Sequence, residues 1–453
     1  MTPTRNTAPR RRGRIRWLII GLAFLAICIN YIDRANLSVA LPYLNTELHL
    51  DPALSGLVLG AFFWTYSLFQ LPLGWLVDKV GSRAMFAVAV VWWSVFTAAT
   101  VVARGIGTLF GIRLLLGIGE AGAFPASARV VEEWFPKRER GIASGIYDSG
   151  ARGGTMLAVP VVTALIAWLG WKGSFIATAS LGIVWAAVWL YVYRSPHAQR
   201  WVSEGELRYI EEGGARTGRQ QAGPETEAGP RIRWRDLFRS RTVWGMAIGF
   251  GCQSYVIYFF ITWFPSYLVD ERHFNLLELG IFGTIPGLVA FLGNFLGGWA
   301  SDALIRRGHS VTFARKACIV GGMLGSTLIG FADLTPSAVL ALVLLSVSFG
   351  CVTFATSSIV ALPVDIAPET SQSLAGSIQG FQNGIANLAG IASPAVIGWL
   401  YGVTGSFSWG LLSAAFVAIA GCLVYLFLVG RIEPLGKAKT LATQPKGIPA
   451  DHE

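Results

Sequence analysis

Six charged side chains lie in stretches of the sequence that are otherwise apolar. They are three acids and three arginines: Asp33, Arg34, Arg113, Glu120, Asp148 and Arg152. A charged group at the centre of a bilayer costs roughly 2.5–3.5 kcal/mol on insertion scales, so such groups normally face a cavity or a partner. Guanidinium groups bind anions, and carboxyl groups can carry protons. This set therefore has the side chains needed to bind an anion and to move a proton.

The helical rise places two of these groups at a similar depth. At ~1.5 Å per residue, Asp33 lies roughly 12 Å and Arg113 about 9 Å from the outer ends of their apolar runs. Because their charges are opposite, we predict that Asp33 and Arg113 form an ion pair. Glu120 follows Arg113 by seven residues on the same helical face. The sequence shows no equally deep basic partner for Glu120.

Roles follow from the chemistry of the groups. A guanidinium stays charged and can hold a carboxylate through two parallel hydrogen bonds, so Arg34 is predicted to bind an anionic substrate. Burial favours the neutral form of a carboxyl group, so Asp33 and Glu120 are predicted to carry a coupling proton. The alternative is that these charges form a satisfied ion-pair network that only holds helices together.

Asp148 and Arg152 are four residues apart, on one helical face. One interpretation is a mutual salt bridge. The other is that Arg152 is a second anion-binding group, which would suit a diacid.

Pairs of polar residues at helical spacing could present hydroxyl and amide groups to a polyhydroxylated ligand. Hydrogen bonding between neighbouring helices is the alternative for each pair. The residues predicted to bind substrate in this way are Tyr66 and Gln70, Tyr255 with its neighbour Tyr258, and Asn383 and Asn387.

The elements that must position these residues are membrane helices. Of the 453 residues, 53% are apolar and only 14% are charged, against roughly 25% charged in an ordinary soluble protein. We predict an all-α polytopic membrane protein with twelve transmembrane helices. The expected spans are 17–41, 54–77, 84–103, 107–130, 141–165, 174–193, 242–269, 276–302, 314–332, 336–362, 373–402 and 407–430.

The composition also argues against several other functions. The five cysteines form no CxxC pair, so neither a disulfide framework nor a metal site is expected. Neither HExxH nor GxSxG in a suitable setting is found, and we expect no enzyme activity.

The basic residues that give the net charge of +10 are distributed in a way that indicates the orientation of the chain in the membrane. If the N-terminus is inside, the internal segments hold 29 of the 36 basic residues and the external loops hold three. This bias predicts that both termini are cytoplasmic, in the inner membrane of a bacterium. The lipid bilayer is then the partner that sorts these charges, and nucleic acid is not expected to be one.

The two halves of the chain resemble each other. Residues 74–78 (GWLVD) recur as residues 298–302 (GWASD), an offset of 224 residues. Parallel repeats of six helices predict a binding site between the halves, near the midplane. The expected division is a tail (1–16), an N-terminal bundle (17–193), a linker (194–241), a C-terminal bundle (242–430) and a second tail (431–453).

Three motifs carry a family resemblance. The loop pattern from Gly74 through Asp78 to Arg83 resembles the signature of the major facilitator superfamily. The run NYIDRAN at 30–36, and RLLLGIGE at 113–120, are similar to the anion:cation symporter family, which includes permeases for galactonate, glucarate, hexuronate and phthalate.

The resemblance implies a monomeric secondary transporter that moves a small organic anion, such as a sugar acid or a related mono- or dicarboxylate, together with a proton and without another cofactor. It supports Asp33 and Glu120 in proton coupling and Arg34 in substrate binding. An exchanger or exporter on the same fold is the alternative. The resemblance adds two sets of positions: Tyr31, Tyr66 and Asn387 in the cavity, and Gly74, Asp78, Arg83 and Asp302 in loops that latch helix ends.

Overall fold

The computed structural model describes residues 14–215, 239–366 and 372–433, so most of the two predicted tails lies outside the described part. The described residues form helices and loops, with no strand. The first half contains α1 (Ile15–Leu48), α2 (Pro52–Val80), α3 (Ser82–Ala99), α4 (Ile106–Glu120), α5 (Ala123–Trp134) and α6 (Arg140–Val192). The second half contains α9 (Arg241–Thr262), α10 (Phe264–Ser266), α11 (Leu276–Phe282), α12 (Thr284–Arg306), α13 (Val311–Ser326), α14 (Ala338–Ile366), α15 (Gln372–Thr404) and α16 (Ser408–Leu423).

The twelve predicted spans are present. Eleven helical stretches of the described chain are long and apolar enough to cross a membrane. One of them, α6, is 53 residues long and contains two spans, because Gly170 breaks it with a φ of 70°. A positive φ is costly for residues with a side chain, which explains glycine at this turn. The expected spans 141–165 and 174–193 are the two arms of α6.

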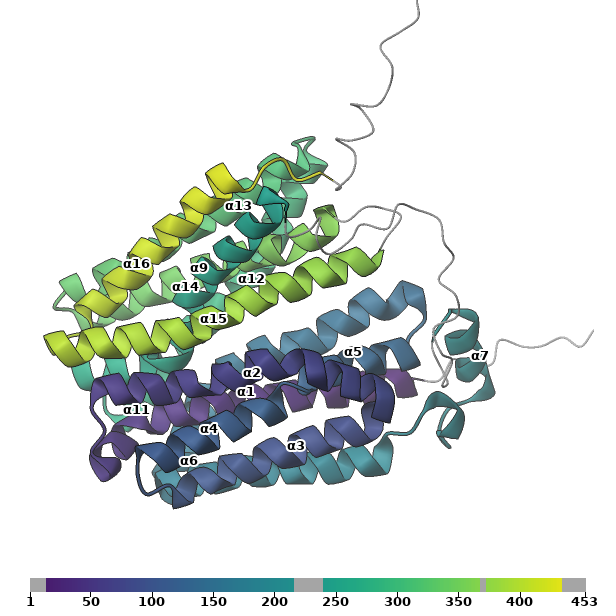
Figure 1. The fold of residues 1–453 in the computed structure, drawn as a ribbon, viewed down its shortest axis with the longest axis horizontal. Helices are drawn as coiled ribbons and strands as arrows, with labels where there is room; N and C mark the ends of the chain where they lie inside the picture. The colour runs from purple at the N-terminus through teal and green to yellow at the C-terminus, as the bar shows by residue number, and fades with distance from the viewer. Residues whose placement is uncertain (1–13, 216–238, 367–371, 434–453) are drawn as a thin grey trace, which may run out of the picture.

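The helices form two groups that correspond to the two halves of the sequence (Figure 1). The repeat extends to the turns that follow the matching helices α2 and α12. Gly81 ends α2 with a φ of 101°, and Gly308 follows α12 with a φ of 89°. Both turns lie at the end of the bundle where α1 begins, which we call the linker end. The opposite end, where α1 gives way to α2, is the far end.

One helix in the predicted linker was not anticipated. α7 (Glu204–Glu212) begins at Ser203, whose side chain accepts a hydrogen bond from the Glu206 backbone. Arg16 of α1 binds Glu206 at 3.0 Å and Glu139 at 3.0 Å. This short helix is therefore anchored to the first half of the chain, at the linker end.

The two halves contact each other near the far end, where α2 crosses α15. There, a Cβ atom on Gly398 would lie 2.5 Å from the Pro52 carbonyl oxygen, and one on Gly56 would collide with the Pro394 carbonyl. The second crossing joins α6 to α11 and α12, where a Cβ on Gly287 would lie 3.2 Å from the Met156 Cα. Toward the linker end the two groups diverge (Figure 1).

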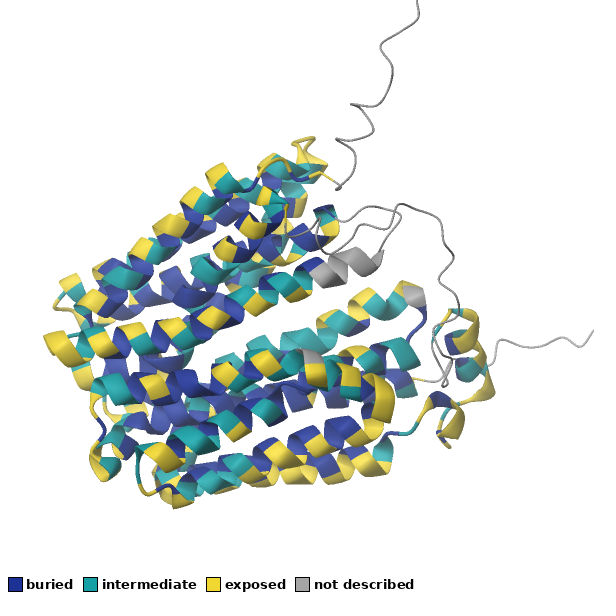
Figure 2. Cartoon of the chain, viewed as in Figure 1, coloured by how far each residue is buried: buried dark blue, intermediate teal, exposed yellow. Residues whose placement is uncertain are grey.

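Exposed residues lie along the outer surface of the bundle (Figure 2), and many of them are large and apolar. Trp168 and Phe427, for example, are 84% and 71% exposed. A soluble monomer rarely carries apolar patches on this scale, whereas lipid-facing helices require them. The structure thus agrees with a protein that crosses a membrane many times.

The close crossing at the far end gives a first prediction. We expect Gly398→Ala to destabilise the closed far end by about 1–3 kcal/mol, since the new methyl group meets the Pro52 backbone, which cannot rotate away. Gly384→Ala, on the same helix with open space around its Cα, is the matched control for the gain in helix propensity.

The measurement is maleimide labelling of Thr262→Cys, a buried far-end position, in a background without the five native cysteines. Gly398→Ala should speed labelling relative to Gly384→Ala. Equal labelling rates would show that this crossing does not seal the far end.

Candidate functional site

A buried ion pair lies at the centre of the first half. The Nε atom of Arg34, on α1, donates to Oε2 of Glu120 at 2.5 Å, and the two side chains are 7% and 0% exposed. Glu120 is the last residue of α4. The sequence reasoning missed this partner of Glu120. Consecutive helical residues point about 100° apart, so Arg34 can face α4 while Asp33 faces elsewhere.

Three aromatic rings surround the Arg34 guanidinium. Its Cζ lies 4.8 Å from the ring centroid of Tyr31, 4.6 Å from that of Phe62 and 4.5 Å from that of Tyr66. Such stacking suits the weakly hydrated guanidinium and fixes its plane. Its Nη2 has no hydrogen-bond partner among the described residues. An edge of the cation therefore remains available for a carboxylate.

Asp33 is buried without an ion pair. It is 1% exposed, and neither carboxylate oxygen has a hydrogen-bond partner in the described structure. Thr178 and Trp93 lie beside it. The predicted pair with Arg113 is not formed, because Asp33 points toward α3 and the second arm of α6. An ionised carboxylate without a partner is costly in such surroundings.

Arg113 lies above Arg34's aromatic neighbour Phe62, with its Cζ 5.7 Å from the ring centroid. Its Nε has no hydrogen-bond partner among the described residues. A hollow of about 10 Å³ is lined by both arginines together with Leu59, Phe62, Phe63, Ile261 and Thr262. A space of this size holds at most one water molecule. A larger ligand cannot reach Arg34 by this route in the present conformation.

Asn30 is a site residue that the sequence reasoning did not single out. It is fully buried, and both its side-chain oxygen and nitrogen lack hydrogen-bond partners in the described part of the chain. It lies one helical turn before Arg34 and close to Glu120. Its spacing of four residues from Arg34 is the signal that could have found it.

The second half contributes Tyr258 and Asn387. The Tyr258 hydroxyl donates to Oδ1 of Asn387 at 3.2 Å, and the Tyr258 ring lies 4.4 Å from that of Phe63. Nδ2 of Asn387 donates to Oε1 of Gln70 at 3.4 Å, which joins α15 to α2. The predicted residues Gln70 and Asn387 are thus brought together across the two halves.

Tyr255 does not belong to this cluster. Its hydroxyl lies 3.1 Å from that of Ser413 on α16, so its polar end is used in packing within the second half. A spacing of three residues leaves Tyr255 and Tyr258 some 60° apart on the helix, and here only Tyr258 reaches the first half. Asn383 accepts a hydrogen bond from Gln379 of its own helix at 3.2 Å.

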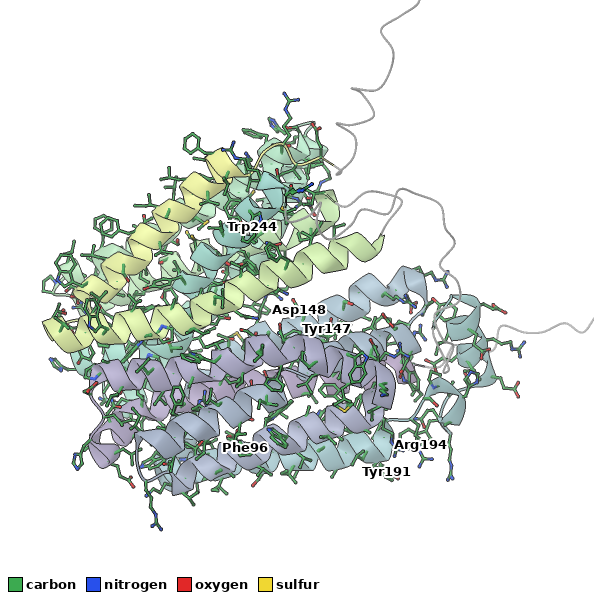
Figure 3. The ribbon with its side chains drawn as sticks, in the orientation of Figure 1. Phe96, Tyr147, Asp148, Tyr191, Arg194 and Trp244 are labelled. Carbon is green, nitrogen blue, oxygen red and sulfur yellow. The ribbon has the colours of Figure 1, made fainter. Side chains whose placement is uncertain are left out.

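Asp148 and Arg152 form the salt bridge that is one of the two interpretations of their spacing. Nη1 of Arg152 donates to Oδ2 of Asp148 at 2.6 Å, and the side chains are 29% and 49% exposed for Arg152 and Asp148 respectively. In contrast to Arg34, this arginine is accessible. Figure 3 shows Asp148 on the side of the first half that faces the second.

The loop-motif residues hold helix ends at the linker end. Arg83 donates to the Leu190 carbonyl at 2.6 Å, and Asp302 lies 3.5 Å from Arg315. Gly74 faces Pro125 of α5, and Asp78 lies within electrostatic range of Arg129. None of these residues is part of the Arg34 cluster. No group of three metal-ligating side chains is found in the described chain.

Comparisons with known proteins agree with this architecture. The family model of the Major Facilitator Superfamily matches residues 23–387. The chain is 36% identical to a D-galactonate transporter of Escherichia coli O6:H1 over 426 residues, 94% of this chain and 98% of the relative. It is also 36% identical to a probable galactarate/D-glucarate transporter of Bacillus subtilis, with 94% of each chain covered.

A solved structure has a similar fold. It is that of a bacterial homolog of the human lysosomal transporter Spinster, in an inward-facing and unoccupied conformation. The TM-score is 0.72 at 19% sequence identity, with 92% of this chain and 98% of that chain covered.

The buried pair gives a second prediction. We expect Arg34→Met to lower stability by roughly 3–5 kcal/mol, because Glu120 is left as an uncompensated charge. The double variant Arg34→Met/Glu120→Leu should recover much of that loss. Unfolding of the purified protein in detergent is measured for Arg34→Met, Glu120→Leu and the double variant, each against the wild type.

The control is the same double-mutant cycle on the exposed pair of Lys172 and Glu47, which are 2.6 Å apart. Its interaction free energy is expected to be about 1 kcal/mol or less. Additive losses at Arg34 and Glu120 would contradict a coupled pair.

Proposed function

Because this chain belongs to the major facilitator superfamily, we propose that it is a secondary transporter that carries a sugar acid or a related small organic anion across the membrane together with a proton. The two relatives above are named as transporters of galactonate and of galactarate/D-glucarate. Their similarity extends over nearly the whole chain, which supports the same class of substrate here.

The observation that carries the proposal is the state of Arg34. Its guanidinium is held by three rings and by Glu120, yet Nη2 is unsatisfied. A buried donor without a partner is costly, so the site favours a ligand that supplies an acceptor. A carboxylate fits best, because it can accept from two guanidinium nitrogens at once.

Coupling to a proton follows from competition for this cation. Glu120 and the substrate carboxylate are two anions for one guanidinium. When Glu120 is protonated, its attraction for Arg34 weakens and the substrate can take the cation without changing the net charge of the site. Asp33, whose buried carboxylate oxygens have no hydrogen-bond partner among the described residues, is the second group that we propose to carry a proton.

Access alternates between the two ends of the bundle. The far end is closed by helix crossings that involve Gly56 and Gly398, and the hollow beside Arg34 on that side is too small for a sugar acid. The excess of basic residues at the linker end leads us to propose that this end is cytoplasmic. The conformation described here would then exchange its ligand with the cytoplasm.

The anion-binding role of Arg34 gives a third prediction. Arg34→Ala should abolish the ligand-induced thermal shift of the purified protein with galactonate or glucarate, since a bound ligand stabilises only a fold that retains its site. Arg34→Lys keeps the charge without the bidentate geometry and should retain weak binding.

Arg208→Gln, at an exposed position on α7, is the control and should behave like the wild type. A full thermal shift with Arg34→Ala would refute the assignment of Arg34.

Proton coupling gives a fourth prediction. In proteoliposomes, Glu120→Gln should abolish accumulation driven by a pH gradient while leaving counterflow, because Gln is permanently neutral. Asp33→Asn should have the same effect if Asp33 also carries a proton. Glu212→Gln, exposed on α7, is the matched control. Normal pH-driven accumulation by both site variants would exclude these carboxyl groups as proton carriers.

A further inference from the structure

The ion pair of Asp148 and Arg152 lies on one stripe of α6. The same face continues toward the far end with Met156, Val159 and Thr163. These three residues meet the second half, where a Cβ on Gly287, Gly283 or Gly280 would contact each of them in turn. The stripe is therefore the face that the first half turns toward the second.

The opposite face of α6 packs on α1 and is closed. A Cβ on Gly150 would lie 2.6 Å from the Phe24 carbonyl oxygen, and one on Gly154 would lie 2.6 Å from the Cys28 carbonyl oxygen. Arg152 cannot turn into that contact. Its charged end is held by Asp148, which lies between the two halves in the region where they diverge (Figure 3).

Tyr31 connects this pair to the proposed binding site. The Arg34 guanidinium lies over the Tyr31 ring at 4.8 Å. Arg152 and Asp148 are also within electrostatic range of the Tyr31 hydroxyl. Two guanidinium groups therefore lie near one tyrosine: Arg34 is deeply buried, and Arg152 is partly exposed.

We propose that Arg152 binds a second carboxylate and that the preferred substrate is a small dicarboxylate. The inference rests on the proposed function, in which Arg34 takes the first carboxylate. Asp148 holds Arg152 in the empty carrier and is displaced when the second carboxylate arrives. A partly exposed pair four residues apart on a helix is weak, so a bidentate ligand can replace it.

Asp148 also gives the site its selectivity. While it is paired, the charge of Arg152 is neutralised, and a monocarboxylate gains nothing from the second arginine. A dicarboxylate replaces the single hydrogen bond between Asp148 and Arg152 by a bidentate pair between its second carboxylate and Arg152. The arrangement thus favours ligands with an anionic group at both ends over those with one.

The test compares a six-carbon aldarate with the matching aldonate. Both share the same hydroxylated carbons between their ends. The aldarate has a second carboxylate where the aldonate has a hydroxymethyl group. Binding to the purified full-length protein is measured by titration at one pH and salt concentration. We expect the wild type to bind the aldarate more tightly.

Arg152→Gln should weaken aldarate binding on the order of 10- to 100-fold, the range for losing a hydrogen-bonded charge, and should change aldonate binding little. Asp148→Asn removes the competitor and should leave aldarate binding equal or tighter. Arg208→Gln disrupts an exposed pair of the same spacing on α7 and is the matched control. Arg152→Lys, which keeps the charge, should give an intermediate loss and covers the case in which Arg152→Gln does not fold.

Several results would overturn the proposal. They are equal losses for both ligands with Arg152→Gln, loss of aldarate binding with Asp148→Asn, or tighter binding of the aldonate by the wild type. A purely structural salt bridge would give similar effects for both variants, independent of the ligand. If the wild type binds neither acid, the proposed function itself fails. If it binds both, and Arg152→Gln keeps the same ratio of aldarate to aldonate affinity, only the role of Arg152 fails.

Discussion

The arrangement of the first half depends on one buried charge pair, that of Arg34 and Glu120. A guanidinium and a carboxylate in an apolar bundle are each costly alone, and together they fix how α1 and α4 face one another. The rings of Tyr31, Phe62 and Tyr66 pack around the buried cation and stabilise it through their faces. The same pair leaves part of the guanidinium unsatisfied, which makes it a binding group as well as a structural one.

The fold could be predicted almost completely from the sequence. Long apolar runs can satisfy their backbone polar groups in a membrane only as helices, so each predicted span has a helical counterpart, although α1 continues beyond the predicted end at Leu41 to Leu48. Where the structure differs, the cause is local: Gly170 is the kink that separates two predicted spans within α6, and Ser203 caps a helix in a segment interpreted only as a linker.

The pairing of the site residues was harder to predict. Depth along a helix follows from counting residues, and in the structure Arg34 and Arg113 line one hollow. Rotation about the helix axis depends on how each helix packs, which one sequence does not reveal. Asp33 and Arg34 differ by one residue and face different helices. Tyr255 and Tyr258 share a helix, yet the Tyr255 hydroxyl contacts Ser413 of its own half whereas the Tyr258 ring contacts Phe63 of the other half.

The two halves contact each other through close backbone packing and hydrogen bonds, whereas ion pairs such as that of Arg34 with Glu120 lie within one half. At the far end, glycines meet backbone carbonyls, and the Ser38 hydroxyl donates to the Thr262 carbonyl. Among the described residues, the ion pairs of Arg34 with Glu120 and of Arg272 with Asp333 each join two residues of the same half, and Arg16 joins the first half to α7 of the linker. Rocking one half against the other therefore breaks no such pair. These pairs can stay intact while the halves rock, so the charged groups whose surroundings change are those that face the space between the halves, such as Arg152 and Asp148.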